Sequence, residues 1–178
     1  MAGAFPNSLY FISTDSIVGV PNLDTLQTLT SSKAATILNG GLPESRPDSL
    51  NVMIQINTSG EDSKSGLPPT IDAESEVVVL AKHVLDTCPR LHLLGLMTIG
   101  SWEESHSGDG KNKDFECLLQ VREQLEQTLR GHKEASWGRN GKLICSMGMS
   151  ADFEEALRAG SGVVRVGSSI FGERERKK

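Results

Sequence analysis

The sequence is poor in aromatic residues, in cysteine and in long apolar runs. Aromatic side chains make up 4% of the 178 residues, and no apolar stretch approaches the roughly 20 residues that a membrane-spanning helix needs. The N-terminus lacks the charged start and the long apolar stretch of a signal peptide. Cysteine occurs only at Cys88, Cys117 and Cys145, never in a Cys-x-x-Cys pair, so neither a disulfide framework nor a zinc knuckle is expected. These absences favour a soluble protein of a reducing, cytoplasmic compartment.

An excess of basic residues is missing as well. The chain has 18 Lys and Arg against 23 Asp and Glu, which gives a formal net charge of -5. Proteins that bind a phosphodiester backbone do so mainly through positive charge. We therefore expect neither nucleic acid nor a membrane among the partners. The four histidines show no metal-ligand spacing, so no metal site is expected either.

Apolar, strand-like runs alternate along the chain with segments of helical periodicity. The strand-like runs cover residues 23–29, 51–57, 91–99, 143–146 and 163–166. The helical segments cover about residues 32–40, 72–88, 115–129 and 152–159. Strands that alternate with helices form right-handed βαβ units, in which the strands are parallel and the helices cover the sheet. The sequence therefore predicts the α/β class.

Two large α/β architectures compete for this pattern. A doubly wound nucleotide-binding sheet would carry a Gly-x-Gly-x-x-Gly loop after an early strand, and no such motif occurs in the chain. The pattern thus favours a parallel β/α barrel of the TIM type. A complete barrel has eight strands in about 250 residues, so five predicted strands correspond to part of one.

Two loops of small residues follow the last two predicted strands. The first runs from Ser146 to Ser150 and the second contains Gly167 and Ser168. In β/α barrels these loops often hold a phosphate, because their backbone N–H groups point at the anion. The alternative is that Ser150 only caps the following helix and that Gly167 is only a turn residue. Position in the sequence leaves both interpretations open.

Arg165 lies in the last predicted strand, two residues before Gly167. Side chains alternate along a strand, so Arg165 points either into the barrel or outward. If it points inward, the buried charge needs a ligand or an acidic partner, because an unpaired one is costly. The alternative is a surface arginine paired with a glutamate of a neighbouring helix.

Four segments together resemble the pyridoxal phosphate homeostasis (proline synthetase co-transcribed) family. They are Asn51–Leu67, Gly95–Gly100, Leu143–Asp152 with its Ser-Met-Gly-Met-Ser-Ala-Asp core, and Val164–Gly172. The resemblance implies a single barrel like the N-terminal domain of alanine racemase. It also implies that the chain binds pyridoxal 5'-phosphate (PLP) as a cytosolic carrier or buffer, without established catalytic turnover, and so is not an enzyme.

Five residues of this sequence match the family's cofactor site. The resemblance implies that Ser150 and the backbone of Met149 hold the phosphate after the seventh barrel strand, and that Gly167 and Ser168 hold it after the eighth. It implies that Arg165 faces the pyridine nitrogen. A guanidinium stays protonated, so the ring nitrogen opposite it stays unprotonated and the ring is a weak electron sink.

The family's Schiff-base lysine, in a Val-Ser-Lys-like first strand, has no counterpart in this sequence. Lys33 falls on a predicted helix face that points outward, and Lys64 belongs to the loop after residues 51–57. Asn57 either lines the same mouth or forms a turn. We expect residues 19–172 to form about strands four to eight of the barrel, between an unassigned segment 1–18 and a charged tail 173–178.

Two consequences follow for function, and two alternatives remain beside them. PLP binding is expected to be non-covalent at best, and the open edges of a partial sheet favour self-association. One alternative is an interaction fragment that binds no cofactor. The other is a racemase-like or decarboxylase-like enzyme, which would need a catalytic tyrosine or cysteine. The single tyrosine, Tyr10, lies in the unmatched segment, and Cys145 has the setting of a buried strand residue.

Overall fold

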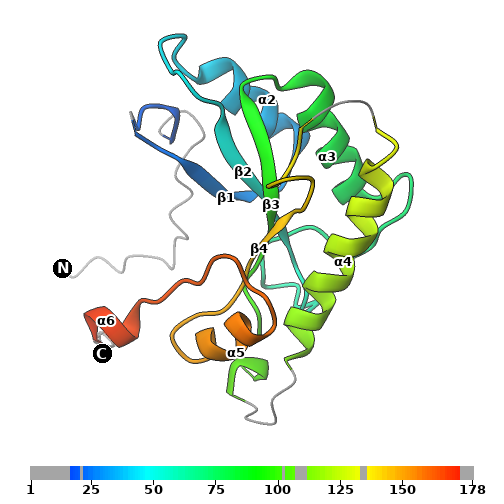
Figure 1. Cartoon of the computed structure of the whole chain (residues 1–178). Coiled ribbons are helices and arrows are strands. Elements are labelled where there is room, and N and C mark those ends of the chain that lie inside the picture. Colours follow the sequence, from blue (N-terminus) through cyan, green and yellow to red (C-terminus); the bar gives the residue numbers. More distant parts are fainter. Residues whose placement is uncertain (1–16, 21, 102, 107–111, 133–135, 173–178) are drawn as a thin grey trace, which may run out of the picture.

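A computed structural model describes residues 17–20, 22–101, 103–106, 112–132 and 136–172. Its centre is a four-stranded sheet of order β1-β2-β3-β4 in which every neighbouring pair is parallel (Figure 1). The strands are β1 (Thr25–Leu29), β2 (Leu50–Ile56), β3 (Leu91–Thr98) and β4 (Ile144–Ser146). Spatial order equals chain order, as successive βαβ crossovers of one hand produce. The predicted α/β class is confirmed, and the sheet is consistent with part of a TIM-type barrel.

Three long helices connect the strands and lie on one side of the sheet (Figure 1). They are α2 (Ser32–Gly41), α3 (Glu76–Thr87) and α4 (Lys113–Leu129). The side chain of Ser31 accepts a hydrogen bond from the Ala34 backbone nitrogen and so caps α2. The predicted helix over 72–88 begins four residues later than expected, at Glu76. The side chain of Asp72 accepts a hydrogen bond from the Glu74 backbone nitrogen, which stabilises a turn before the helix.

Three short helical elements lie near the carboxyl ends of the strands. They are η1 (Glu104–His106), α5 (Phe153–Arg158) and α6 (Ser168–Phe171). The helix predicted over residues 152–159 is confirmed as α5. Helix α6 stands away from the sheet at the end of an extended segment (Figure 1).

The two faces of the sheet differ in composition. The face toward the helices packs a large apolar core that includes Val52, Ile54 and Leu96. The opposite face carries only a small separate cluster of Met53, Leu94 and Met97 with Ile144 against it. Buried polar side chains also occur on the strands, namely those of Gln55, Thr98 and Ser146. Polar groups are buried where they have partners. Here Gln55 donates to the Ser65 carbonyl, the Thr98 hydroxyl contacts that of Thr58, and the Ser146 hydroxyl donates to Gln27.

The fifth predicted strand, over residues 163–166, is wrong. The segment forms one isolated parallel bridge, between Ser146 and Val163, and no strand. The hydroxyl of Ser161 lies within hydrogen-bond distance of the carbonyl oxygens of Cys145, Met147 and Val163, at 3.3, 2.9 and 2.8 Å. Backbone hydrogen bonds still join Met147 to Val163, Val163 to Cys145 and Arg165 to Gly148. Residues 163–165 therefore lie beside β4 without forming a strand of their own.

Within the described part of the chain, no helix has both the length and the hydropathy to cross a bilayer. No group of three or more His, Cys, Asp or Glu residues is placed there to hold a metal ion. The three cysteines are free thiols, with Cys88 and Cys145 buried and Cys117 half-buried.

Candidate functional site

The two predicted phosphate loops meet beyond the carboxyl end of β4. The hydroxyl oxygen of Ser150 accepts hydrogen bonds from the backbone nitrogens of Gly167, at 2.9 Å, and of Ser169, at 3.5 Å. Ser150 therefore does not cap its own following helix, because the N-cap position of α5 is Asp152. Gly167 is the residue before α6, and Ser168 is the first residue of that helix. The structure thus brings Ser150, Gly167 and Ser168 together, with a serine oxygen against N–H groups that an anion oxygen would also accept.

Met149 is engaged differently from the other predicted phosphate residues. Its backbone nitrogen donates a hydrogen bond of 2.6 Å to Oδ1 of Asp152, a carboxylate that is 6% exposed. The turn itself depends on Gly148, which has a φ of +92° and whose added Cβ would lie 2.4 Å from the Cβ of Ala156. The turn after β4 is therefore a compact unit fixed against α5, and its first N–H group already has a charged acceptor.

The Arg165 side chain lies across the carboxyl ends of β3 and β4. Its Nη1 donates to the Ser146 hydroxyl at 2.8 Å, and its Nη2 donates to the Thr98 carbonyl at 2.7 Å. Both partners are neutral, so the outward arginine paired with a helix glutamate is not what the structure contains. Burial lowers the pKa of the Arg165 guanidinium, and the charge of Asp152 acts in the opposite direction. Arginine nevertheless remains protonated at neutral pH.

A second layer of polar groups supports these contacts. The Ser146 hydroxyl donates to Oε1 of Gln27 at 2.7 Å, and the hydroxyls of Thr58 and Thr98 lie 2.8 Å apart. Sequence reasoning gave Gln27, Thr58 and Thr98 no role, and it placed Ser146 only as the first residue of a predicted phosphate loop. The signal that could have found two of them is a polar residue at the carboxyl end of an apolar run, as at Thr98 and Ser146.

Neither candidate lysine lies free at this site. Lys33 is exposed on α2, as predicted. Lys64 reaches the carboxyl end of the sheet, but its amine donates to the Gly100 carbonyl at 3.0 Å and pairs with Glu61 at 2.7 Å. Asn57 forms a turn, with its side-chain oxygen accepting a hydrogen bond from the Gly60 backbone nitrogen. Tyr10 lies outside the described residues.

A cavity of about 710 Å³ opens beside the loops that follow β2 and β3. Its charged lining residues are Glu61, Glu103, Glu104, Asp114 and Lys113. Four carboxylates against one ammonium group disfavour an anionic ligand. Of the two neighbouring areas, the one around Ser150 and Arg165 therefore suits a phosphate better.

The protein-family comparison matches residues 10–175 to the alanine racemase N-terminal domain. The chain belongs to this family. Among curated proteins it is 43% identical over 167 residues to the pyridoxal phosphate homeostasis protein of Homo sapiens, which covers 93% of this chain and 56% of the relative. It is 41% identical over 174 residues to the protein of the same name from Schizosaccharomyces pombe, which covers 98% of this chain and 66% of the relative. The resemblance read from the sequence is confirmed.

Solved structures of similar fold cover most of the chain. The crystal structure of an unknown protein from Bifidobacterium adolescentis has a TM-score of 0.68 at 29% identity and matches 90% of this chain and 58% of its own. PipY of Synechococcus elongatus with PLP bound has a TM-score of 0.66 at 20% identity, over 89% of this chain and 65% of PipY. The second match supports the barrel-like fold. The chain spans about half to two thirds of the length of these relatives.

Proposed function

We propose that this chain binds PLP non-covalently at the carboxyl ends of β3 and β4, and that it takes part in intracellular PLP homeostasis. The observation that carries the proposal is the half-buried Arg165 guanidinium, held by two neutral acceptors, close in sequence to the Ser150 and Gly167 pair. A cation with neutral partners favours a ligand that brings an acceptor or a negative charge. The curated relatives carry the name of this function, and PipY was solved with PLP bound.

The phosphate group would lie against the loops around Ser150 and Gly167. A phosphate oxygen can accept the Gly167 N–H that Ser150 now accepts, and the Ser150 hydroxyl can then donate its own proton to the phosphate. Ser168 adds a backbone N–H and a hydroxyl. The backbone N–H of Met149 belongs to the proposed set too, but it would have to leave the Asp152 carboxylate to reach the anion. Glycine and serine bind the anion through hydrogen-bond donors without adding charge.

The pyridine ring would lie toward Arg165. An N–H group of the guanidinium would donate to the ring nitrogen, which would then carry no proton of its own. Bound PLP supplies an aldehyde and a ring that can delocalise electrons, and an unprotonated ring nitrogen weakens the second of these. This favours a protein that holds PLP over an enzyme that turns over substrates with it.

The lysines support non-covalent binding. An aldimine needs a free ε-amine, and the amine of Lys64 is held by Gly100 and Glu61 while Lys33 points to solvent. The proposed binding domain is residues 19–172, and the proposed location is the cytoplasm. There are two alternatives. One is an interaction fragment that binds no cofactor, and the other is a racemase-like or decarboxylase-like enzyme.

The test is a titration of the purified chain with PLP, followed by absorbance, borohydride reduction and mass spectrometry. We expect saturable binding and no stoichiometric phosphopyridoxyl-lysine. A stoichiometric adduct at Lys33 or Lys64 would contradict non-covalent binding. The absence of saturable binding would favour the interaction fragment, and racemisation or decarboxylation of added amino acids would favour an enzyme.

A further inference from the structure

We infer that Gln27 is a positioning residue for Arg165 and acts on it through Ser146. The inference rests on the proposed function, because it concerns how the chain recognises the ring of PLP. Gln27 lies on β1 and Ser146 at the end of β4, which are the two outer strands of the sheet. Their side chains nevertheless meet at 2.7 Å, so the sheet curves and its polar face is concave.

The chemistry of the three groups fixes the direction of each hydrogen bond. The guanidinium of Arg165 can only donate, so the Ser146 oxygen is the acceptor at 2.8 Å. A hydroxyl has one proton, and the Ser146 hydroxyl gives it to Oε1 of Gln27. Because Gln27 takes that proton, the lone pairs of Ser146 remain available to Arg165. Each bond in such a chain polarises the next.

The burial of Ser146 makes the direction of these hydrogen bonds important for Arg165. Ser146 has no exposed surface, so without Gln27 its hydroxyl has no solvent partner and must turn its proton elsewhere. An unpaired buried hydroxyl is unfavourable, and a hydroxyl proton turned toward Arg165 repels the guanidinium. The second anchor of Arg165, the carbonyl of Thr98, holds only Nη2. The position of Nη1 therefore depends on Gln27.

The geometry separates two functions of the site, recognition of the ring nitrogen and binding of the phosphate. Among the described residues, neither Ser150 nor Gly167 makes a hydrogen bond to Gln27 or to Ser146. A change at Gln27 is thus expected to affect recognition of the ring nitrogen and to leave the phosphate loops unchanged.

The experiment compares PLP with its analogue in which CH replaces the ring nitrogen. Both carry the same phosphate, so the ratio of their affinities reports the ring-nitrogen contact alone. The variants are Gln27→Met, which keeps the shape and removes the acceptor, and Gln27→Glu, which restores an acceptor. Gln127→Met, at an exposed position of α4, is the matched control, and Ser146→Ala tests the middle of the chain.

We expect the wild-type chain to prefer PLP and the Gln127→Met variant to match it. Gln27→Met and Ser146→Ala should each reduce that preference about tenfold, as for one hydrogen bond to a charged group, and Gln27→Glu should restore it. A preference that is unchanged in both folded variants would overturn the inference while leaving the proposed function intact. Equal losses of affinity for both ligands would also overturn it, because they indicate a structural role. Failure of the wild-type chain to bind PLP would overturn the proposed function and the inference with it.

Discussion

The hydroxyl oxygen of Ser150 lies 2.9 Å from the backbone nitrogen of Gly167, so one phosphate loop satisfies an N–H group of the other. This hydrogen bond fixes the two loops against each other. Order of this kind lowers the entropy that a ligand must otherwise overcome on binding. A phosphate that binds here exchanges one oxygen acceptor for another.

Replacing Ser150 by alanine tests this exchange. The Ser150→Ala variant keeps the Gly167 N–H but loses the hydroxyl that would donate to the phosphate. We expect the affinity for PLP, and for inorganic phosphate as a competitor, to fall about fivefold, as for one hydrogen bond of about 1 kcal/mol. Isothermal titration calorimetry measures both. Ser45→Ala, in an exposed loop, is the control, and an equal loss in that variant would contradict a specific role for Ser150.

Replacing Arg165 by leucine separates the ring from the phosphate. The Arg165→Leu variant should keep inorganic phosphate affinity within about twofold, because the phosphate loops are unchanged. The absorption spectrum of bound PLP should change, since the ring nitrogen loses its charged donor. Arg165→Lys keeps the charge but not the two-pronged contact with Ser146 and Thr98. An unchanged spectrum in the leucine variant would show that Arg165 does not face the ring.

The strands were predictable where apolar runs are long enough to be buried on both sides. This holds for β2 and β3, whose residues are almost all buried. The segment 163–166 has the same apolar character but forms only one bridge. Its backbone hydrogen bonds join it to Cys145, Met147 and Gly148, next to a β4 of only three residues. The length of the neighbouring strand depends on the fold, and the periodicity of residues 163–166 does not contain it.

The site divides in a similar way. That Ser150, Gly167 and Ser168 come together was predictable, because loops at the carboxyl ends of parallel strands converge at one edge of the sheet; their contact with a phosphate stays a prediction. The pairing of Gln27 with Ser146 was not, since it joins residues 119 positions apart and depends on the curvature of the sheet. Asp152 is a similar case, because its carboxylate occupies the Met149 N–H that the family resemblance assigns to phosphate.

Gly148 should tolerate no side chain. Its φ is +92°, and an added Cβ would lie 2.4 Å from Ala156. Gly160 is a matched control, with a φ of +94° and nothing within 4 Å of an added Cβ. We expect Gly160→Ala to lower the free energy of unfolding by about 1 to 2 kcal/mol and Gly148→Ala by about 1 to 3 kcal/mol more. Urea unfolding measures the difference, and equal effects would show that Ala156 does not restrict this turn.

Cys145 should make stability fall at alkaline pH. Burial raises the pKa of the Cys145 thiol to about 11, and the charge of Arg122 lowers it in part. An unfolded cysteine ionises near pH 8.5, so between about pH 9 and 11 the unfolded chain loses a proton that the folded chain keeps. Stability contributed by this group therefore falls as pH rises, by about 1.4 kcal/mol per pH unit. A Cys145→Ala variant should lose this part of the slope; an identical slope in both chains would contradict the assignment.

Self-association through β1 is the remaining expectation. β1 is the last strand on one side of the sheet, and in the described part of the chain no strand pairs with its outer edge. Unpaired edges template pairing with another chain, and lysine on an edge opposes it. We expect the wild-type mass from light scattering to rise with concentration and Thr28→Lys, at an exposed position of β1, to remain monomeric. Gln127→Lys on α4 carries the same added charge as a control.

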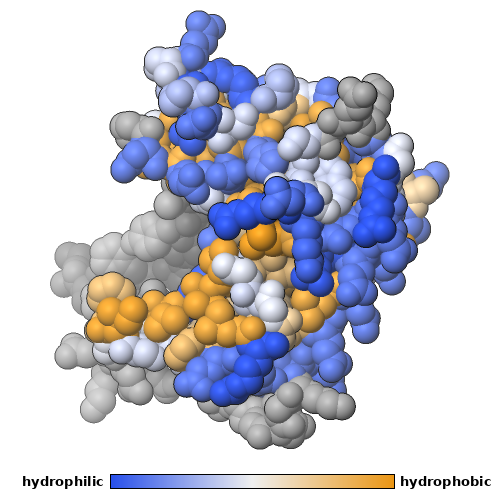
Figure 2. All heavy atoms as spheres, viewed as in Figure 1, coloured by the Kyte–Doolittle hydropathy of each residue, from blue (hydrophilic) through white to orange (hydrophobic). Residues whose placement is uncertain are grey.

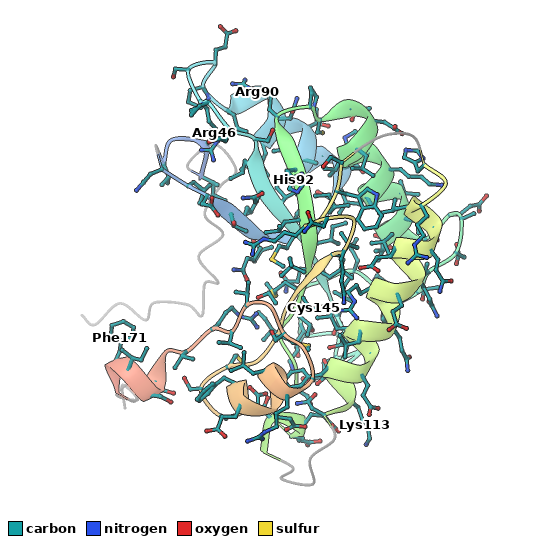
Figure 3. All side chains as sticks on the ribbon, in the orientation of Figure 1. Arg46, Arg90, His92, Lys113, Cys145 and Phe171 are labelled. Atoms are coloured by element: carbon teal, nitrogen blue, oxygen red, sulfur yellow. The ribbon has the colours of Figure 1, made fainter. Side chains whose placement is uncertain are left out.

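A second surface competes with this edge. Ile170 and Phe171 on α6 are 67% and 86% exposed, and Figure 2 shows an apolar area over this helix and the segment before it. The Phe171 side chain projects away from the sheet (Figure 3). Apolar patches of this kind also drive association, so Phe171→Ser is the deciding variant. If Phe171→Ser yields monomers while Thr28→Lys still associates, the contact lies on α6 and the expectation of edge pairing is wrong. If only Thr28→Lys yields monomers, the chains pair through β1. In that case the charge on the strand edge prevents association, and the loss of the exposed Phe171 ring has no effect on it.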